Sequence, residues 1–148
     1  MSLDETYLSE IADRMVRETP QAAALGIEFV SAEPGVGIMK VAYRADLVGD
    51  PQTGVLAGGV ITTLLDHTCG LAVGRRTGGG SATLDLRIDY MRSAEPGRDV
   101  FARADCYKLT RTIAFLRAIA YEDNPEDPIA TAQGAFVLAG APPASPPP

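Results

Sequence analysis

The chain has no tryptophan, a single histidine (His67) and only two cysteines in 148 residues. One histidine cannot supply a His-x-x-x-His pair, so zinc sites built from several histidines are excluded, and no metal is expected. Cys69 and Cys106 both stand in apolar segments. A structural disulfide is conceivable, but two buried free thiols fit a reducing cytoplasm better.

Long apolar runs and an excess of basic charge are also missing. No apolar run reaches the roughly 18 residues that a membrane span needs. The first residues lack the basic and apolar regions of a signal peptide. The net charge is −6 and the pI about 4.7, which argues against a nucleic-acid-binding surface. We therefore expect a soluble, cytoplasmic protein that binds neither nucleic acid nor membrane.

Several nucleotide-binding and hydrolase motifs are absent as well. No Gly-x-Ser-x-Gly motif is present, so an α/β-hydrolase triad has no support. The run 78–80 is three glycines without the Lys-Ser/Thr of a P-loop, and we predict a turn there. No dinucleotide-binding fingerprint surrounds Gly37. Nucleotide hydrolysis and hydride transfer are therefore not expected.

The chain does carry a clear pattern of predicted elements, and its 46% hydrophobic content is enough for one domain with a core. The predicted helices are 3–18, 20–25 and 58 to about 76, and the predicted strands are 27–33, 36–44, 84–90, 98–109, 112–122 and 129–138. This order indicates an α+β fold in which a curved antiparallel sheet wraps a central hydrophobic helix. We divide the chain into an N-terminal helical segment (1–26), a main domain (27–139) and a disordered proline-rich tail (140–148).

One carboxylate, Asp66, stands in the apolar run 57–73 of the predicted central helix. An ionised aspartate in such surroundings carries a desolvation cost unless it is hydrogen-bonded, paired or catalytic. A threonine one turn earlier, Thr62 or Thr63, is one candidate partner. Spacing alone leaves threonine pairing and catalysis equally open.

Two segments resemble the hotdog-fold acyl-CoA thioesterases, and most closely the phenylacetate-degradation (PaaI) type. Gly54, Gly58, Gly59 and Asp66 fall in the register of the family's glycine-rich motif and its carboxylate, and the strand block 83–92 follows. A second family block resembles the segment 108–115. The resemblance covers roughly residues 25–138 and implies a hotdog fold. It also implies homodimers or homotetramers with active sites at the subunit interfaces.

The resemblance implies roles for three residues. The Gly58 N–H would act as oxyanion donor, and a glycine there lets the substrate approach the backbone closely. Asp66 would act either as general base on water or as nucleophile. Thr83 falls where close relatives carry a water-orienting serine. Strand alternation places Thr83 on the strand face opposite to that of Leu84 and Leu86, and this face suits a site shared with a partner chain. Alternatively, Thr83 could simply begin a strand.

Contacts to coenzyme A (CoA) are implied for a few further residues. Lys108, Arg111 and Thr112 match a CoA-contacting segment, but a solvated hairpin corner explains them equally well. Tyr90 also matches a CoA-contact position, while its alternation with Ile88 favours packing in the core. No cofactor is expected beyond the CoA of the substrate.

The sequence departs from the family pattern at two positions. The family histidine is Ala57 here, and the family asparagine falls at Pro51, so Gln52 would have to offer its amide instead. Ala57, Gly59 and Gln52 would line the substrate. Losing one preorganised oxyanion donor typically costs about 100- to 1000-fold in rate.

Three functions remain in competition. The first is an acyl-CoA or aryl-acyl-CoA thioesterase, and the second is a hotdog-fold acyl-CoA-binding protein that has lost catalysis. The third, dehydratase chemistry, usually needs a histidine paired with an acid. It ranks last because His67 lies about 100° around the helix from Asp66.

Overall fold

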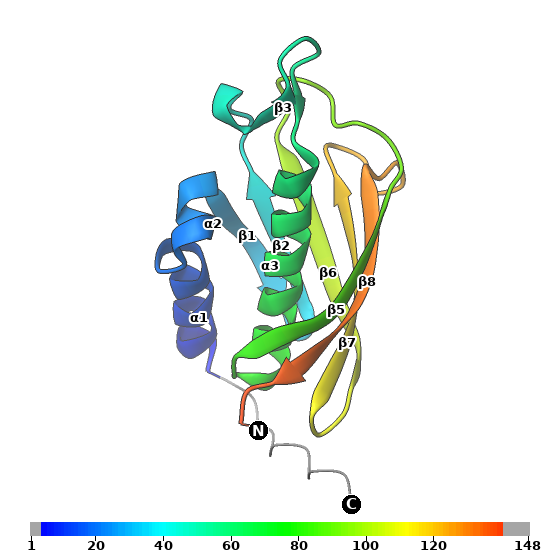
Figure 1. Cartoon of the computed structure of the whole chain (residues 1–148). Helices are drawn as coiled ribbons and strands as arrows, with labels where there is room; N and C mark the ends of the chain where they lie inside the picture. Colours follow the sequence, from blue (N-terminus) through cyan, green and yellow to red (C-terminus); the bar gives the residue numbers. More distant parts are fainter. Residues whose placement is uncertain (1–3, 141–148) are drawn as a thin grey trace, which may run out of the picture.

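The computed structural model describes residues 4–140 and shows an antiparallel sheet of six strands curved around one long helix (Figure 1). The helices are α1 (Glu5–Arg17), α2 (Pro20–Leu25) and α3 (Gly58–Thr77), and the sheet strands are β1 (Ile27–Glu33), β2 (Val36–Val41), β5 (Ser81–Tyr90), β6 (Val100–Leu109), β7 (Ile113–Tyr121) and β8 (Ala130–Leu138). The strand order is β1-β2-β6-β7-β8-β5, so β1 and β5 form the two edges. The expected α+β class is confirmed. Residues 141–148 of the predicted tail lie outside the described residues.

The central position of α3 follows from its composition and from the small residues that face it. Eleven of its residues are buried, mostly leucine, valine and isoleucine. The inner face of the sheet is rich in buried alanines, namely Ala102, Ala104, Ala114, Ala118, Ala120, Ala130 and Ala132. At Gly37 of β2 an added Cβ would lie 2.9 Å from the Leu71 side chain, so only glycine fits. Small side chains therefore let the sheet approach α3 closely.

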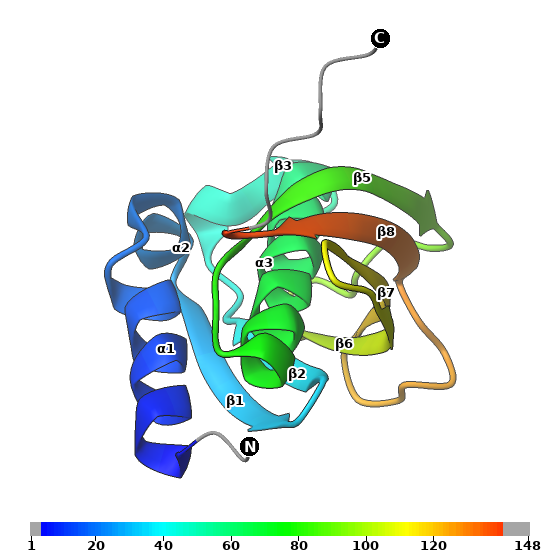
Figure 2. The same ribbon diagram turned by 90° about the horizontal axis from the view of Figure 1, so that it is seen from below.

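The helix ends follow the local capping signals. The Asp4 carboxylate accepts a hydrogen bond from the Thr6 N–H at 3.1 Å and caps α1, whereas the alternative cap Ser2 lies outside the described residues. Pro20 begins α2, and Gly26 ends it in the left-handed conformation with φ 69°. Gly78 ends α3 in the same way, with φ 72°. Figure 2 shows α1 and α2 beside α3, on the side that the curled sheet leaves open.

Some predicted boundaries were wrong because long-range contacts decide them. The strand expected to reach residue 44 ends at Val41. Beyond it, the Asp99 carboxylate accepts a hydrogen bond from the Tyr43 N–H at 3.0 Å. The loop expected before α3 contains a 3₁₀ turn (Ala45–Leu47) and a small two-stranded sheet of β3 (Val48–Asp50) and β4 (Val55–Leu56). The second strand of this small sheet, β4, ends two residues before α3 begins at Gly58.

A bulge in β5 overturns the predicted alternation of that strand. Thr83 pairs with Phe136 and Asp85 with Ala135, so Leu84 is an extra residue in the ladder. Leu84 is consequently 57% exposed rather than buried, and Tyr90 at the strand end is 52% exposed. Thr83 is turned inward to α3 of its own chain, opposite to the expected direction.

A buried carboxylate, Glu122, ties together the loops at one end of the sheet. Arg92 donates to both of its oxygens, at 2.6 and 3.2 Å, and the Glu95 N–H donates at 2.7 Å. Burial alone would raise the pKa of Glu122, but Arg92 and the Glu95 N–H outweigh burial and hold the pKa below its ordinary value of 4.5. The ionised carboxylate therefore stabilises the folded state.

Replacing Glu122 by Gln is expected to lower the free energy of unfolding at pH 7 by about 2 kcal/mol, because charge-assisted hydrogen bonds are lost. Since the folded-state pKa is depressed, this stabilisation is present above about pH 4.5 and is lost as the pH falls through the folded-state value. Urea unfolding at pH 7 and at pH 3.5 measures both effects, with the exposed neighbour Glu126→Gln as control. An equal loss at the two pH values would contradict the proposed role of the charge.

Candidate functional site

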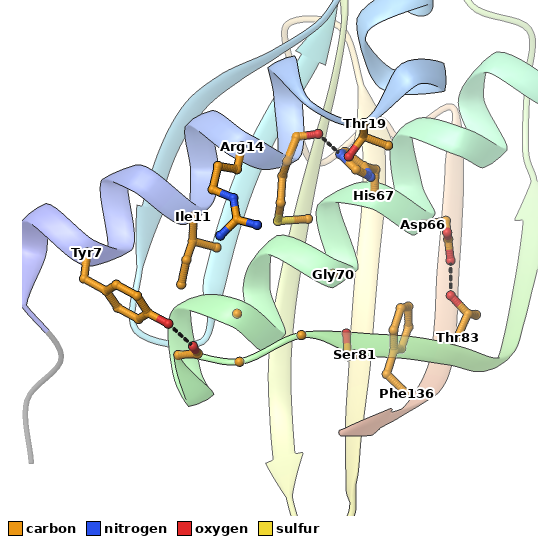
Figure 3. Close-up of a pocket in the computed structure, with 15 residues that line it drawn as sticks. Tyr7, Ile11, Arg14, Thr19, Asp66, His67, Gly70, Ser81, Thr83 and Phe136 are labelled. Carbon is orange, nitrogen blue, oxygen red and sulfur yellow. Dashed lines mark hydrogen bonds between the residues drawn. The ribbon is translucent and has the colours of Figure 1, made fainter. Parts of the chain in front are cut away.

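Asp66 lies near the middle of α3, half-buried, with its side chain directed to β5 (Figure 3). The Thr83 hydroxyl donates to Asp66 Oδ1 at 2.7 Å. Thr62 and Thr63 instead donate to the carbonyl oxygens one turn earlier on α3, at 3.1 and 3.0 Å. The interpretation in which one of these helix threonines satisfies Asp66 is therefore wrong, and its partner comes from β5.

The Asp66–Thr83 pair lies in the wall of a cavity of about 440 Å³ between α1, α3 and β5. The Thr83 hydroxyl donates to Asp66 Oδ1, and in the described part of the chain no protein donor bonds to Asp66 Oδ2. One fixed oxygen sets the orientation of the carboxylate, while the other can take a proton from water or attack a carbonyl. Ile11 and Met15 of α1, and Gly70 and Gly74 of α3, also line this cavity.

The two other reactive side chains on α3 do not share the chemistry of Asp66. His67 Nε2 lies 2.7 Å from the Met15 carbonyl oxygen and ties α3 to α1. Cys69 is fully buried in the core, and burial, assisted by the charge of Asp66, raises the pKa of its thiol to about 12. Cys106 is also buried and free, as predicted. A protonated thiol is a poor nucleophile, so Asp66 remains the candidate reactive group of this cavity.

The N-terminus of α3 forms a second feature. Gly58 is the first helical residue, and its N-cap Ala57 makes no side-chain hydrogen bond to the helix. The first N–H groups of a helix have no partner within the helix and favour negative charge. A Cβ at Gly59 would meet no atom within 4 Å, so a ligand can approach the backbone here.

Tyr90 holds this helix start in place. Its hydroxyl donates to the Gly58 carbonyl oxygen at 3.0 Å and contacts the Thr62 hydroxyl. The expectation that Tyr90 packs in the core is wrong, since its side chain lies at the surface beside Gly58. Tyr90 therefore fixes the Gly58–Gly59 peptide, which directly follows the peptide that carries the candidate oxyanion donor, the Gly58 N–H.

Asp66 and Gly58 do not meet within one chain. Eight residues separate them on one helix, which corresponds to about 12 Å along the axis. An oxyanion donor must lie about 3 Å from the reacting oxygen, and a base or nucleophile must be equally close to the reacting centre. Gly58 instead lines a separate cavity of about 350 Å³ with Tyr90 and Met91.

The other predicted binding residues lie apart from both cavities. Gln52 is exposed in the β3–β4 turn, where its N–H donates to Asp50 at 2.9 Å. This bond, with one from the Thr53 hydroxyl, lowers the pKa of Asp50.

The predicted CoA-contacting residues lie at the tip of the β6–β7 hairpin, near the C-terminal end of α3 and far from Gly58 (Figure 1). Lys108 and Arg111 are exposed, and Thr112 is half-buried. The structure thus joins Asp66 to Thr83 within one chain but leaves this hairpin outside both cavities.

Sequence reasoning missed the residues of α1 and β8 that line the Asp66 cavity, notably Met15 and Phe136. Only the fold reveals them, since both come from distant segments. One signal was present in the sequence: Gly70 and Gly74 follow Asp66 at four-residue spacing, on the same face of the helix. No helix between residues 4 and 140 has the length and apolar character to cross a membrane.

Comparison with known proteins agrees with this architecture. A protein from Pseudomonas aeruginosa shares 39% identity, with 88% of this chain and 98% of that chain covered at a TM-score of 0.80. A mutant of the phenylacetic acid degradation protein PaaI from Thermus thermophilus shares 29%, with 80% and 97% covered at 0.71. The protein smu.793 from Streptococcus mutans, bound to acetyl CoA, shares 25%, with 77% and 89% covered at 0.68.

The sequence matches no curated protein. Its fold is the hotdog fold of the PaaI-type proteins, as the resemblance implied. The sequence model of the Thioesterase superfamily matches residues 53–129, a segment that contains Gly58, Asp66 and Thr83. The chain belongs to the thioesterase superfamily.

Proposed function

We propose that the protein is an acyl-CoA thioesterase that hydrolyses an acyl- or aryl-acyl-CoA to the free acid and CoA. The observation that carries this proposal is the Asp66 carboxylate, fixed by Thr83 in the wall of a cavity, in a member of the thioesterase superfamily. The acetyl-CoA-bound structural relative supports a CoA thioester as the substrate class. The two buried free thiols fit a reducing cytoplasm.

Asp66 would supply the nucleophilic step. In the general-base form, Asp66 takes a proton from water as the water oxygen bonds to the thioester carbon. In the nucleophilic form, the carboxylate itself attacks and gives a mixed anhydride that water then hydrolyses. In both forms the C–S bond breaks, the electron pair leaves with the CoA sulfur, and a proton restores the thiol. The structure supports Thr83 as the residue that orients Asp66 in either form.

The oxyanion donor would come from a second copy of the chain. The separation of Asp66 and Gly58 along α3 prevents one chain from placing both at one thioester carbonyl. The edge strand β5 exposes Leu84 (57%) and leads into the exposed Met91 (59%). Unpaired edge strands with apolar side chains are common association surfaces. We therefore propose a homodimer, or a homotetramer made of two such dimers, with active sites at the interface.

The Gly58 N–H would act at the oxyanion without side-chain help. Ala57 has no donor group, and Pro51 and Gln52 lie in the exposed β3–β4 turn. This backbone-only arrangement favours a slower enzyme than one with an additional donor. The exposed cations Lys108 and Arg111 suit the phosphates of CoA bound across the interface.

The missing side-chain donors also support a second candidate, a hotdog-fold protein that binds acyl-CoA without cleaving it. A thiol-release screen over short, medium, long-chain and aromatic acyl-CoAs separates the two. We expect release of free CoA from at least one class, at a rate proportional to enzyme concentration. Saturable binding of the same compounds without thiol release would replace the thioesterase with the binding protein.

A further inference from the structure

We propose that the cavity between α1, α3 and β5 holds the acyl group of the thioester, and that Gly70 and Gly74 set the length of acyl group that it accepts. This inference rests on the proposed thioesterase function. It assigns the distal part of the substrate to one particular space and makes the N-terminal helix α1 a wall of the substrate site.

The cavity extends from Asp66 along a single face of α3. Asp66, Gly70 and Gly74 follow each other at four-residue spacing, and Gly78 closes the row at the end of the helix. From Asp66 to Gly74 the row covers about 12 Å along the helix axis. Glycine inside a helix is unfavourable compared with alanine. Both interior glycines line the cavity, and their lack of side chains also lets Ile11 and Met15 of α1 lie close to α3.

Apolar side chains form part of the opposite walls, beside the polar Arg14, Thr19 and Ser81. Ile11 and Met15 of α1 line one side, and the buried Phe136 of β8 lines another. Figure 3 shows Ile11 and Phe136 on two sides of the cavity. A Cβ at Gly74 would lie 3.5 Å from Ile11 Cγ2, and a Cβ at Gly70 would lie 3.3 Å from Met15 Cε. The methyl group of an alanine at position 74 would therefore make an ordinary van der Waals contact with Ile11, and it would occupy part of the cavity.

The far end of the cavity lies where α1 meets the turn after α3. The Tyr7 hydroxyl donates to the Gly78 carbonyl oxygen at 2.9 Å across this end. The volume of about 440 Å³ falls within the range of small-molecule pockets. An aromatic or medium-length acyl group fits the limited length of the cavity and the apolar part of its wall, formed by Ile11, Met15 and Phe136. A very long chain would have to displace α1.

The test is Gly74→Ala, measured over a series of straight-chain acyl-CoAs and phenylacetyl-CoA. We expect kcat/KM for acetyl-CoA to change by less than about twofold, and that for the longest good substrate to fall by about tenfold, as one misfitted methylene group typically costs. Met15→Ala is expected to shift the preference toward longer chains. Glu10→Ala, on the exposed face of α1 outside the cavity, is the matched control.

A second readout separates substrate fit from stability. Gly74→Ala is expected to leave the Tm unchanged or raise it, because alanine is the better helix former and its methyl group meets no clash. An equal fall of kcat/KM for every acyl-CoA, acetyl-CoA included, would overturn the inference, because a space occupied by the pantetheine arm is insensitive to acyl length. Absence of thiol release with the unmodified protein would instead refute the proposed function. Binding of non-hydrolysable acyl-CoA ketone analogues then tests the length preference directly.

Discussion

Replacing Asp66 by Asn is expected to lower kcat for a good acyl-CoA substrate by about 10²- to 10⁴-fold, the usual contribution of a general base. Asparagine has nearly the same shape, and its carbonyl oxygen can still accept the Thr83 hydroxyl hydrogen bond now made to Asp66 at 2.7 Å. It cannot take a proton from water or form an anhydride. The rate of thiol release at saturating substrate measures the effect.

A conservative change elsewhere on β5, outside the cavity, provides the control. Asp85 lies on β5, two residues from Thr83, but is exposed and does not line the Asp66 cavity. Asp85→Asn should leave turnover within about twofold of the unmodified protein, as is usual for surface substitutions. If Asp66→Asn turned over substrate as fast as Asp85→Asn, Asp66 would be neither base nor nucleophile.

Replacing Gly58 by Pro is expected to lower kcat by about 10²- to 10³-fold while α3 stays intact. Proline lacks the N–H that would stabilise the oxyanion, yet it is well tolerated at the first position of a helix. Gly58 occupies this position, and the preceding Ala57 has φ −62° and ψ 139°, a conformation that residues before proline favour. The variant therefore removes the N–H and adds the proline ring, while the helix start is preserved.

The control for this variant is Gly58→Ala, which keeps the N–H. A Cβ there would lie 3.8 Å from the Tyr90 ring, in ordinary van der Waals contact. We expect Gly58→Ala to retain most of the activity and both variants to unfold at similar urea concentrations. If the proline and alanine variants lost activity equally, the N–H would have no role and a steric effect on the substrate would remain.

The helices could be predicted from sequence because their signals are local. Pro20 and Gly26 delimit α2, and Asp4 caps α1, through the chemistry of one or two residues. The bulge at Leu84 could not be predicted, because it depends on the pairing of β5 with β8. A period-2 pattern carries no information on where a ladder gains an extra residue. The predicted orientation of Thr83 failed for this reason.

The candidate site divides in the same way. Asp66 could be identified because a lone carboxylate in an apolar helix needs a partner or a role, and the family resemblance supplied the role. Its hydrogen-bond partner Thr83 was also a predicted site residue, but it was expected to face a site shared with a partner chain. The cavity could not be foreseen, because α1 docks on α3 through contacts such as that of His67 with the Met15 carbonyl oxygen, which join segments 52 residues apart. The spacing of Gly70 and Gly74 was the one sign of this cavity in the sequence.

The most direct test of a site shared by two chains is the activity of a mixed dimer of the Asp66→Asn and Gly58→Pro variants. The two variants are co-expressed with different tags, and dimers that carry both tags are isolated. One of the two sites then combines the intact Asp66 of one chain with the intact Gly58 of the other. We expect such dimers to regain about half of the unmodified activity, since one of two symmetric sites is complete. Activity no higher than that of either variant alone, in dimers shown to be intact, would contradict a site built from both chains.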